Sequence, residues 1–183
     1  FVSRGLGDVY KRQSQPFKDV FARLDLGYLE PMFGGLGGEI LYRPFDRPYA
    51  VGFSMHKVKQ RGYRQLFAFK DYATTTGHLG FYFDFPYQIH SRLMVGKYLA
   101  GDTGVTLDLS RRFKSGFQAG VFASKTNLSA EEFGEGSFDK GFYISIPTNL
   151  FYSDFRTGAI TFGLHPLTKD GAAALIQHNS LIS

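Results

Sequence analysis

The most regular feature of the chain is an alternation of apolar side chains with small, polar or charged ones at every second position. The stretch 105–110 reads Val-Thr-Leu-Asp-Leu-Ser, and the stretches 78–85 and 117–124 follow the same rule. Successive side chains of a β-strand point to opposite faces, so each stretch predicts a strand with one apolar and one polar face. Segments of about ten residues with this pattern, repeated along a chain, are typical of outer-membrane β-barrels.

The alternation and the turn residues between its stretches divide the chain into strands. The predicted strands cover residues 20–28, 38–43, 49–58, 75–85, 91–99, 104–112, 117–126, 141–149 and 157–166, with a less regular tenth at 172–182. Short turns rich in proline or glycine are expected at 44–48, 86–90 and 114–116, and longer links at 29–37, 59–74 and 127–140. The sequence therefore predicts an all-β protein, an antiparallel up-and-down transmembrane β-barrel segment of about nine or ten strands.

Strand periodicity also assigns a side to individual residues. Lipid is expected to face Leu79, Phe81, Phe83, Val105, Leu107, Phe117, Ala119 and Val121. The lumen is expected to face His78, Tyr82, Thr106, Asp108, Gln118 and Ser124. Because such barrels join short periplasmic turns with longer external loops, we expect 59–74 and 127–140 on the outer side and the short turns on the periplasmic side.

Charged residues on the polar sides of the strands form the first set of candidate functional residues. The candidate lumen charges are Arg23, Asp25, Glu39, Arg43, Asp108 and Arg112. Paired charges of this kind either line a path for a hydrated polymer, anchor partner loops, or neutralise one another inside a filled barrel. A second set, Lys57, Lys59 and Arg61, recurs at every second position. It predicts either a basic mouth for an anionic polymer or for lipopolysaccharide phosphates, or a solvated strand end.

The link at 127–140 combines acidic and aromatic residues, which a simple spacer does not need. The candidate polymer or loop contacts are Glu131, Glu132, Phe133, Glu135, Phe138, Asp139 and Lys140. A glycosidase holds two carboxylates at a fixed separation, and a link interrupted by Gly134 and Gly136 is a poor frame for that purpose. We therefore expect contact with a sugar polymer or with a neighbouring part of the same protein, and no catalytic residue.

Composition narrows the remaining chemistry. The chain has no cysteine, which excludes disulfides and thiolate metal sites, and its five histidines are scattered without ligand spacing. The glycine-rich stretch 34–38 lacks the lysine of a phosphate-binding loop and is not followed by a helical pattern, which favours a glycine-rich hairpin or a close strand approach. The net charge of +5 is modest for a nucleic-acid binder. We expect no metal, no cofactor and no nucleic-acid partner.

The N-terminal residues differ in character from the rest. Residues 1–13 (FVSRGLGDVYKRQ) resemble the translated adapter sequence found at the ends of assembled environmental reads. We expect this segment to be a non-native addition, and residues 14–183 to be a partial outer-membrane β-barrel domain.

Several longer motifs resemble a known family. The motifs lie at 27–45, 58–61, 77–78, 96–102, 108–113, 125–142 and 166–171, so the similarity covers about residues 20 to 175. The chain is similar to the YjbH-type exopolysaccharide-biosynthesis outer-membrane family. The resemblance implies a non-catalytic outer-membrane β-barrel component of exopolysaccharide or capsule secretion, here as the C-terminal part of a longer protein.

The resemblance also implies partners, and it leaves alternatives open. The implied partners are outer-membrane lipid and lipopolysaccharide, the exopolysaccharide, other envelope proteins of the same secretion operon, and the remainder of the longer chain. The alternatives are a general porin-like channel, an enzyme acting on polysaccharide, and a soluble carbohydrate-binding β-barrel. The soluble alternative predicts that the aromatic faces of the strands turn inward.

Overall fold

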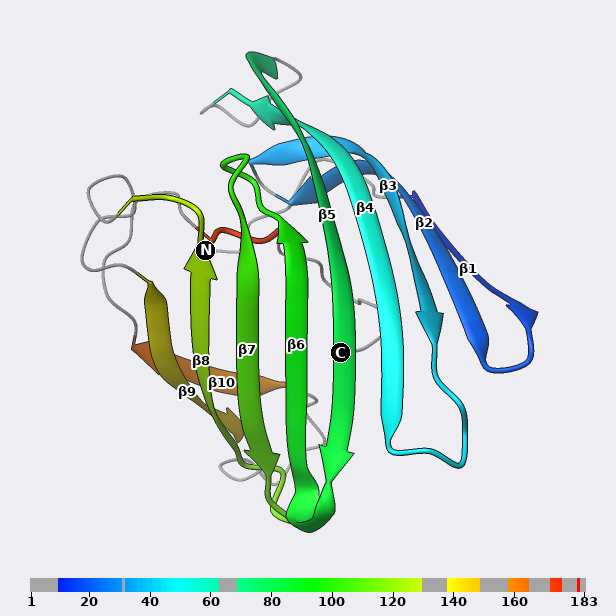
Figure 1. The fold of residues 1–183 in the computed structure, drawn as a ribbon, viewed down its shortest axis with the longest axis vertical. Helices are drawn as coiled ribbons and strands as arrows, with labels where there is room; N and C mark the ends of the chain where they lie inside the picture. The colour runs from blue at the N-terminus through cyan, green and yellow to red at the C-terminus, as the bar shows by residue number, and fades with distance from the viewer. Residues whose placement is uncertain are drawn as a thin grey trace.

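Ten strands form one antiparallel sheet in which every strand pairs with its neighbours in the chain (Figure 1). The computed structural model of the chain describes residues 10–30, 32–62, 69–129, 138–148, 158–164, 172–175 and 181. The strands are β1 (Tyr10–Phe17), β2 (Val20–Glu30), β3 (Phe33–Tyr42), β4 (Tyr49–Arg61), β5 (Phe69–Phe85), β6 (Ile89–Lys97), β7 (Thr103–Arg112), β8 (Gln118–Thr126), β9 (Asp139–Pro147) and β10 (Ala159–Leu164). A short 3₁₀ turn, η1 (Pro86–Gln88), joins β5 to β6.

The sheet is strongly curved but open. Figure 1 shows β4 to β8 running side by side, with β1 and β10 turning away at the two ends of the row. Within the described residues β1 pairs only with β2, and β10 pairs only with β9. The all-β, up-and-down expectation is therefore confirmed, while the described part of the chain is an open sheet and does not by itself close into a barrel.

The two faces of the sheet differ sharply in chemistry. We call the face that carries the following buried polar residues the inner face: Arg23, Asp25, Glu39, His56, Thr76, Thr106, Asp108, Ser110, Ser124 and Thr126. We call the opposite face the outer face, and it exposes Leu24, Leu26, Ile40, Phe53, Met55, Leu79, Phe81, Phe83, Val95, Val105, Leu107, Leu109, Val121 and Phe142. This is the reverse of a water-soluble protein, which buries its large apolar side chains and leaves charges in solvent.

Strand alternation in the sequence anticipated these faces. The residues expected on the lipid side that are large and lie within strands are all exposed on the outer face, among them Phe81 and Val121. Thr106, Asp108 and Ser124, expected toward a lumen, are buried on the inner face. Phe53 on β4 and Phe81 and Phe83 on β5 are exposed on the outer face, contrary to the inward orientation that a soluble β-barrel predicts, whereas Tyr82 of β5 lies on the inner face. Contact of the outer face with lipid stays a prediction.

Three of the predicted elements differ from the structure. In the link expected at 59–74, β4 continues to Arg61 and β5 begins at Phe69, so most of the described residues of this link belong to strands. The expected link at 29–37 is instead a tight turn between β2 and β3, because the glycine-rich stretch 34–38 lies within β3. This stretch forms the close strand approach: a Cβ at Gly37 would stand 2.2 Å from the imidazole of His56 on β4. The less regular tenth strand was expected at 172–182, but its described residues, 172–175 and 181, do not lie in a strand.

The N-terminal strand was not expected at all. β1 begins at Tyr10 and pairs with β2 from Tyr10–Leu26 to Phe17–Val20, so it includes the last residues of the segment 1–13. Residues 1–9 lie outside the described residues. The proposed division of the chain at residue 13 stays a prediction.

The C-terminal residues return to the sheet. The backbone N–H of Ala172 donates to Asp102 Oδ2 at 2.9 Å, and the N–H of Leu99 donates to the carbonyl of Ala173 at 2.9 Å. Further along, the N–H of Leu181 donates to Glu39 Oε2 at 3.0 Å. The described C-terminal residues, red in Figure 1, therefore contact both the β6–β7 connection and the inner face of β3.

Within the described ranges, no helix has the length and apolar character needed to cross a membrane.

Candidate functional site

A buried group of charges lies where β2, β3 and β4 meet. We call Arg23, Asp25, Glu39 and His56 the inner charge cluster. Arg23 Nη2 lies 3.0 Å from Asp25 Oδ2 and 3.3 Å from Glu39 Oε2, and the side chains of Arg23 and Asp25 are only 1% and 2% exposed. His56 Nε2 completes the cluster 3.4 Å from Asp25 Oδ2. Burial of this many charges is tolerable only when they are paired.

Strand register explains why these four residues meet. Arg23 and Asp25 are two positions apart on β2 and share a face, and Arg23 stands directly opposite Glu39 on β3. Asp25, Gly37 and His56 form one row across three strands. Because Gly37 has no side chain, the imidazole of His56 reaches across β3 to Asp25. The backbone N–H of Leu181 also donates to the carboxylate of Glu39.

A line of hydroxyl groups occupies the middle of the inner face. Tyr98 OH lies 2.5 Å from Thr106 Oγ1, which donates to Ser124 Oγ at 2.7 Å. Tyr98 belongs to the connection between β6 and β7, and burial raises the pKa of its hydroxyl above the ordinary value of a tyrosine. Tyr98 is therefore protonated at neutral pH and donates or accepts hydrogen bonds without carrying charge.

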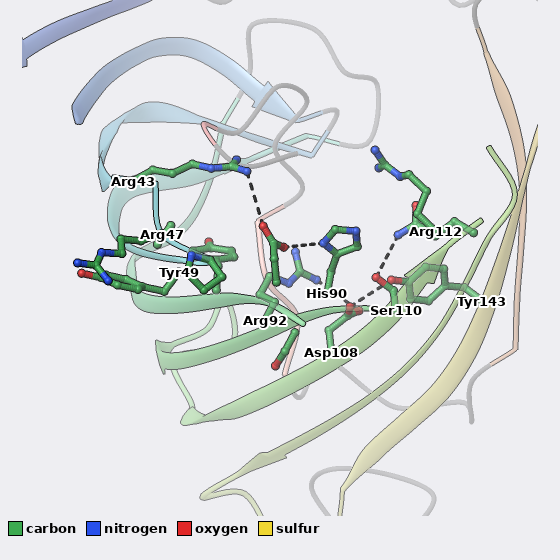
Figure 2. Close-up of a pocket in the computed structure, with 15 residues that line it drawn as sticks. Arg43, Arg47, Tyr49, His90, Arg92, Asp108, Ser110, Arg112 and Tyr143 are labelled. Atoms are coloured by element: carbon green, nitrogen blue, oxygen red, sulfur yellow. Dashed lines mark hydrogen bonds and ion pairs between the residues drawn. The ribbon is translucent and has the colours of Figure 1, made fainter. Parts of the chain in front are cut away.

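A second polar site lies at one end of the inner face, near the turns β3–β4, β5–β6 and β7–β8. It is a cavity of about 280 Å³ that is open to solvent on one side. We call it the arginine pocket; it is lined by Arg43, Arg47, Tyr49, Tyr82, Asp84, His90, Ser91, Arg92, Asp108, Ser110, Arg112, Gln118 and Tyr143, with Pro48 and Ala50. Figure 2 shows the labelled side chains, with Arg47 and Tyr49 at the left of the view, His90, Arg92 and Asp108 near its centre, and Arg112 and Tyr143 at the right.

Hydrogen bonds and loose ion pairs hold the walls of the arginine pocket. Asp84 lies between His90 Nδ1 at 2.6 Å and Arg43 Nη2 at 3.9 Å, and all three side chains are about half exposed (Figure 2). On the other wall, Tyr143 OH donates to Asp108 Oδ1 at 3.1 Å, and Arg92 Nη2 lies 3.7 Å from Asp108 Oδ2.

Two arginines of the pocket have no acidic partner among the described residues. These are Arg47, in the β3–β4 turn, and Arg112, at the end of β7. Four guanidinium groups thus face two carboxylates, which leaves a formal excess of two positive charges around the cavity. Clefts with an excess of one sign concentrate ions of the opposite sign.

The candidate lumen charges separate into these two sites. Arg23, Asp25 and Glu39 come together in the inner charge cluster, and Arg43, Asp108 and Arg112 line the arginine pocket. Sequence reasoning missed His56 in the first site, and Asp84, His90, Arg92 and Tyr143 in the second. Arg92 is placed in the pocket by its pairing with Asp108 across β6 and β7.

The three residues of the predicted basic mouth do not share one environment. Lys57 and Lys59 are exposed on β4, whereas Arg61 is buried, with its guanidinium carbon 3.8 Å from the centre of the Tyr28 ring. The pairing of β4 with β5 shifts between Lys59 and Arg61, and this irregularity interrupts the alternation. A role of these residues as a mouth for an anionic polymer stays a prediction.

Most of the acidic link lies outside the described residues, including Glu131, Glu132, Phe133 and Glu135. Of the residues that are described, Phe138 is exposed, and the Lys140 ammonium lies 4.7 Å from the centre of its ring. Asp139 begins β9 opposite Ser124 of β8. The expected contact of this link with a polymer stays a prediction.

In the part of the chain that the structure describes, no three histidine, aspartate or glutamate side chains form a group that could hold a metal ion.

Comparison with known proteins assigns the chain to a family. Residues 9–183 match the family model YjbH, described as "Exopolysaccharide biosynthesis protein YbjH". The chain is also 46% identical over 154 residues to the "Uncharacterized lipoprotein YjbH" of Escherichia coli (strain K12), and the match covers 81% of this chain and 22% of that protein. No solved structure matches the chain. The similarity to this family that the sequence motifs indicated extends over nearly the whole chain. The chain therefore belongs to the YjbH exopolysaccharide biosynthesis family.

Proposed function

We propose that this chain is part of an outer-membrane β-barrel that serves the export or surface assembly of a bacterial exopolysaccharide, and that it acts without catalysis. Its outer face contacts lipid, and its inner face lines or fills the lumen. The family to which the chain belongs supports the polymer class. The name of the E. coli relative describes a lipoprotein, which supports a place in the cell envelope.

The observation that carries the proposal is the reversed distribution of side chains on the sheet. The outer face exposes an apolar band that crosses β2 to β9, with Val121 at 54% exposure, while the inner face buries Arg23 at 1%. Monomeric soluble proteins rarely expose an apolar patch this continuous. A bilayer accepts such a face, provided that the backbone groups of the strands are paired with one another.

Closure of the barrel requires strands beyond those described. The chain spans 22% of the length of its E. coli relative, so a longer protein has ample sequence for further strands. We propose that the remainder of the full-length protein pairs with the open edges of β1 and β10. Edges left unpaired in lipid would expose backbone groups at a cost of several kcal/mol each.

The mechanism we propose is passive. Charged, amide and hydroxyl groups of the arginine pocket, such as those of Arg112 and Gln118, offer hydrogen bonds to a hydrated sugar chain. No step of bond breaking is assigned to any residue.

A substitution on each face tests the membrane assignment. Leu107→Arg places a charge on the outer face in the middle of β7, and we expect it to destabilise the inserted protein by about 2–4 kcal/mol. Gln118→Arg is the matched control, because Gln118 lines the open arginine pocket on the inner face. The measurement is the amount of full-length protein that resists extraction from the outer-membrane fraction, together with a refolding titration into lipid vesicles. A sheet surrounded by water predicts no loss for Leu107→Arg.

Function is tested in cells and in vesicles. A strain that lacks the gene should release less exopolysaccharide, and the wild-type gene should restore release. The main alternative, a general porin-like channel, predicts ion conductance in planar bilayers that the polymer does not alter and normal polymer release from the deletion strain.

A further inference from the structure

The arginine pocket combines the size, charge and polar lining that a small ligand needs. Its volume, about 280 Å³, lies near the lower end of the range of roughly 300–1,000 Å³ that is typical of small-molecule sites. It is therefore suited to a single sugar unit and its immediate neighbours. The cavity is open to solvent on one side.

The charge of the pocket is not compensated internally. Where this protein buries charges for structural purposes, in the inner charge cluster, the ion pairs are 3.0 and 3.3 Å long. In the pocket the two arginine–aspartate pairs are 3.7 and 3.9 Å long, and Arg47 and Arg112 have no acidic partner among the described residues. Guanidinium groups bind carboxylates and phosphates through two parallel hydrogen bonds, so the free groups match an anionic ligand.

The remaining lining supplies contacts for a sugar ring. Tyr49, Tyr82 and Tyr143 bring aromatic faces and hydroxyl groups from three strands. Gln118 adds an amide group and Ser110 adds a hydroxyl group to the wall, and Gln118 Nε2 donates to Ser110 Oγ at 3.2 Å. Aromatic rings with polar edges and hydrogen-bonding side chains fit a ring that has apolar faces and hydroxyl edges.

We propose that the arginine pocket binds an anionic sugar unit, a sugar ring that carries a carboxylate or a phosphate group. The inference rests on the proposed function in one respect: if the protein serves polysaccharide export, the ligand is an acidic sugar of the exported polymer. The same chemistry is also offered by the phosphorylated sugars of lipopolysaccharide, and the experiment below distinguishes the two sources.

The experiment measures binding to the full-length protein in a zwitterionic detergent by isothermal titration calorimetry. The probes are trigalacturonate, maltotriose as a neutral trisaccharide of equal length, and glucosamine 1-phosphate. We expect trigalacturonate to bind at least about tenfold more tightly than maltotriose, an advantage that falls as salt is added, because a charged hydrogen bond in an arginine pair is stronger than a neutral one.

Arginine variants connect the binding to the pocket. Arg112→Gln and Arg47→Gln should each weaken trigalacturonate binding by about tenfold and leave maltotriose binding unchanged. Arg111→Gln is the matched control: it removes the same charge from the neighbouring residue, whose guanidinium carbon lies 4.9 Å from the centre of the Phe113 ring and does not line the pocket. Circular dichroism of each variant verifies the folded sheet.

The outcomes separate this site from the proposed function. Equal binding of the acidic and neutral trisaccharides, or equal losses in Arg112→Gln and Arg111→Gln, would overturn the site while leaving the membrane role intact. Preference for trigalacturonate over glucosamine 1-phosphate assigns the ligand to an acidic polymer, and the reverse preference assigns it to lipopolysaccharide. Selective binding by a protein that fails to enter the outer membrane would retain the site and refute the proposed function.

Discussion

The inner charge cluster and the arginine pocket contain similar residues on the same face of one sheet, yet they are built differently. In the cluster, Arg23 is enclosed between two carboxylates and is 1% exposed. In the pocket, Arg92 is 45% exposed, and its carboxylate partner lies 3.7 Å away. Buried charges are costly unless all of them are paired, whereas exposed pairs contribute little to stability. The comparison indicates that the cluster maintains the fold and that the pocket is available to bind.

The largest expected difference follows from removing one arginine at each site. Arg23→Met leaves the carboxylates of Asp25 and Glu39 buried without their cation, and we expect a loss of about 3–5 kcal/mol in the free energy of unfolding. Arg112→Met, in the pocket, should cost less than about 0.5 kcal/mol. Denaturant titration of the full-length protein in detergent, followed by circular dichroism, measures both.

A compensated variant sharpens this first test. Arg23→Met combined with Asp25→Asn and Glu39→Gln removes the stranded charges along with the cation, so it should recover part of the stability that Arg23→Met loses. Equal costs of Arg23→Met and Arg112→Met would contradict the structural distinction between the two sites.

Packing around glycines provides the second test. A Cβ at Gly37 would stand 2.2 Å from the His56 ring and 2.5 Å from the carbonyl oxygen of Met55. Gly37→Ala should therefore displace His56 from Asp25 and cost about 1–3 kcal/mol. At Gly52, near the pocket, the nearest atom to an added Cβ is Tyr82 Cε2 at 3.4 Å, an ordinary contact.

Gly52→Ala is accordingly the control for Gly37→Ala. We expect its free energy of unfolding to remain within about 0.5 kcal/mol of the wild type, as for a substitution that creates neither a cavity nor an overlap. If Gly52→Ala proved as destabilising as Gly37→Ala, the surroundings of the inner charge cluster and of the pocket would be equally dense, and the open character of the pocket would be refuted.

The smallest expected effect concerns the exposed acid of the pocket. Asp84 pairs with His90 and Arg43, but all three side chains are about half exposed. Asp84→Asn should change stability by less than about 1 kcal/mol. Because it removes a negative charge from the wall, it should tighten trigalacturonate binding by about two- to fivefold, the equivalent of such an exposed pair.

Asp71→Asn serves as the control for that change, since Asp71 is exposed toward the other end of β5 and does not line the pocket. Calorimetry at low and moderate salt compares the two variants. An unchanged affinity of Asp84→Asn for trigalacturonate would show that the bound anion does not interact with the carboxylate of Asp84.

The strands and their faces could be predicted because alternation is a local property. The stretch 105–110 places its leucines outward and Thr106, Asp108 and Ser110 inward, as the structure confirms. Glycine carries no side chain to alternate, so the stretch 34–38 was taken for a link although it lies within β3. β1 was missed because residues 1–13 were set aside as non-native and the rest of the strand shows no clear alternation.

The sites themselves depend on register, which local sequence does not contain. Asp25 meets His56 because Gly37 lies between them in the same row, an arrangement that involves three strands and 31 positions of separation. Likewise Arg92 meets Asp108 only through the pairing of β6 with β7. Of the candidate lumen charges, Arg23, Asp25, Glu39 and Asp108 are buried on the inner face, but the division of the set into two sites could not be derived from the sequence.

The contact between Leu181 and Glu39 also has a consequence for the order of folding. The two residues are 142 positions apart, whereas the ten strands pair only with their neighbours in the chain. Each hairpin can thus form early, but contacts between distant parts of a chain form late and slow the overall rate. The carboxylate of Glu39 therefore receives this donor only after a segment 142 positions away has returned to β3, so the inner charge cluster is completed later than the hairpins that carry it.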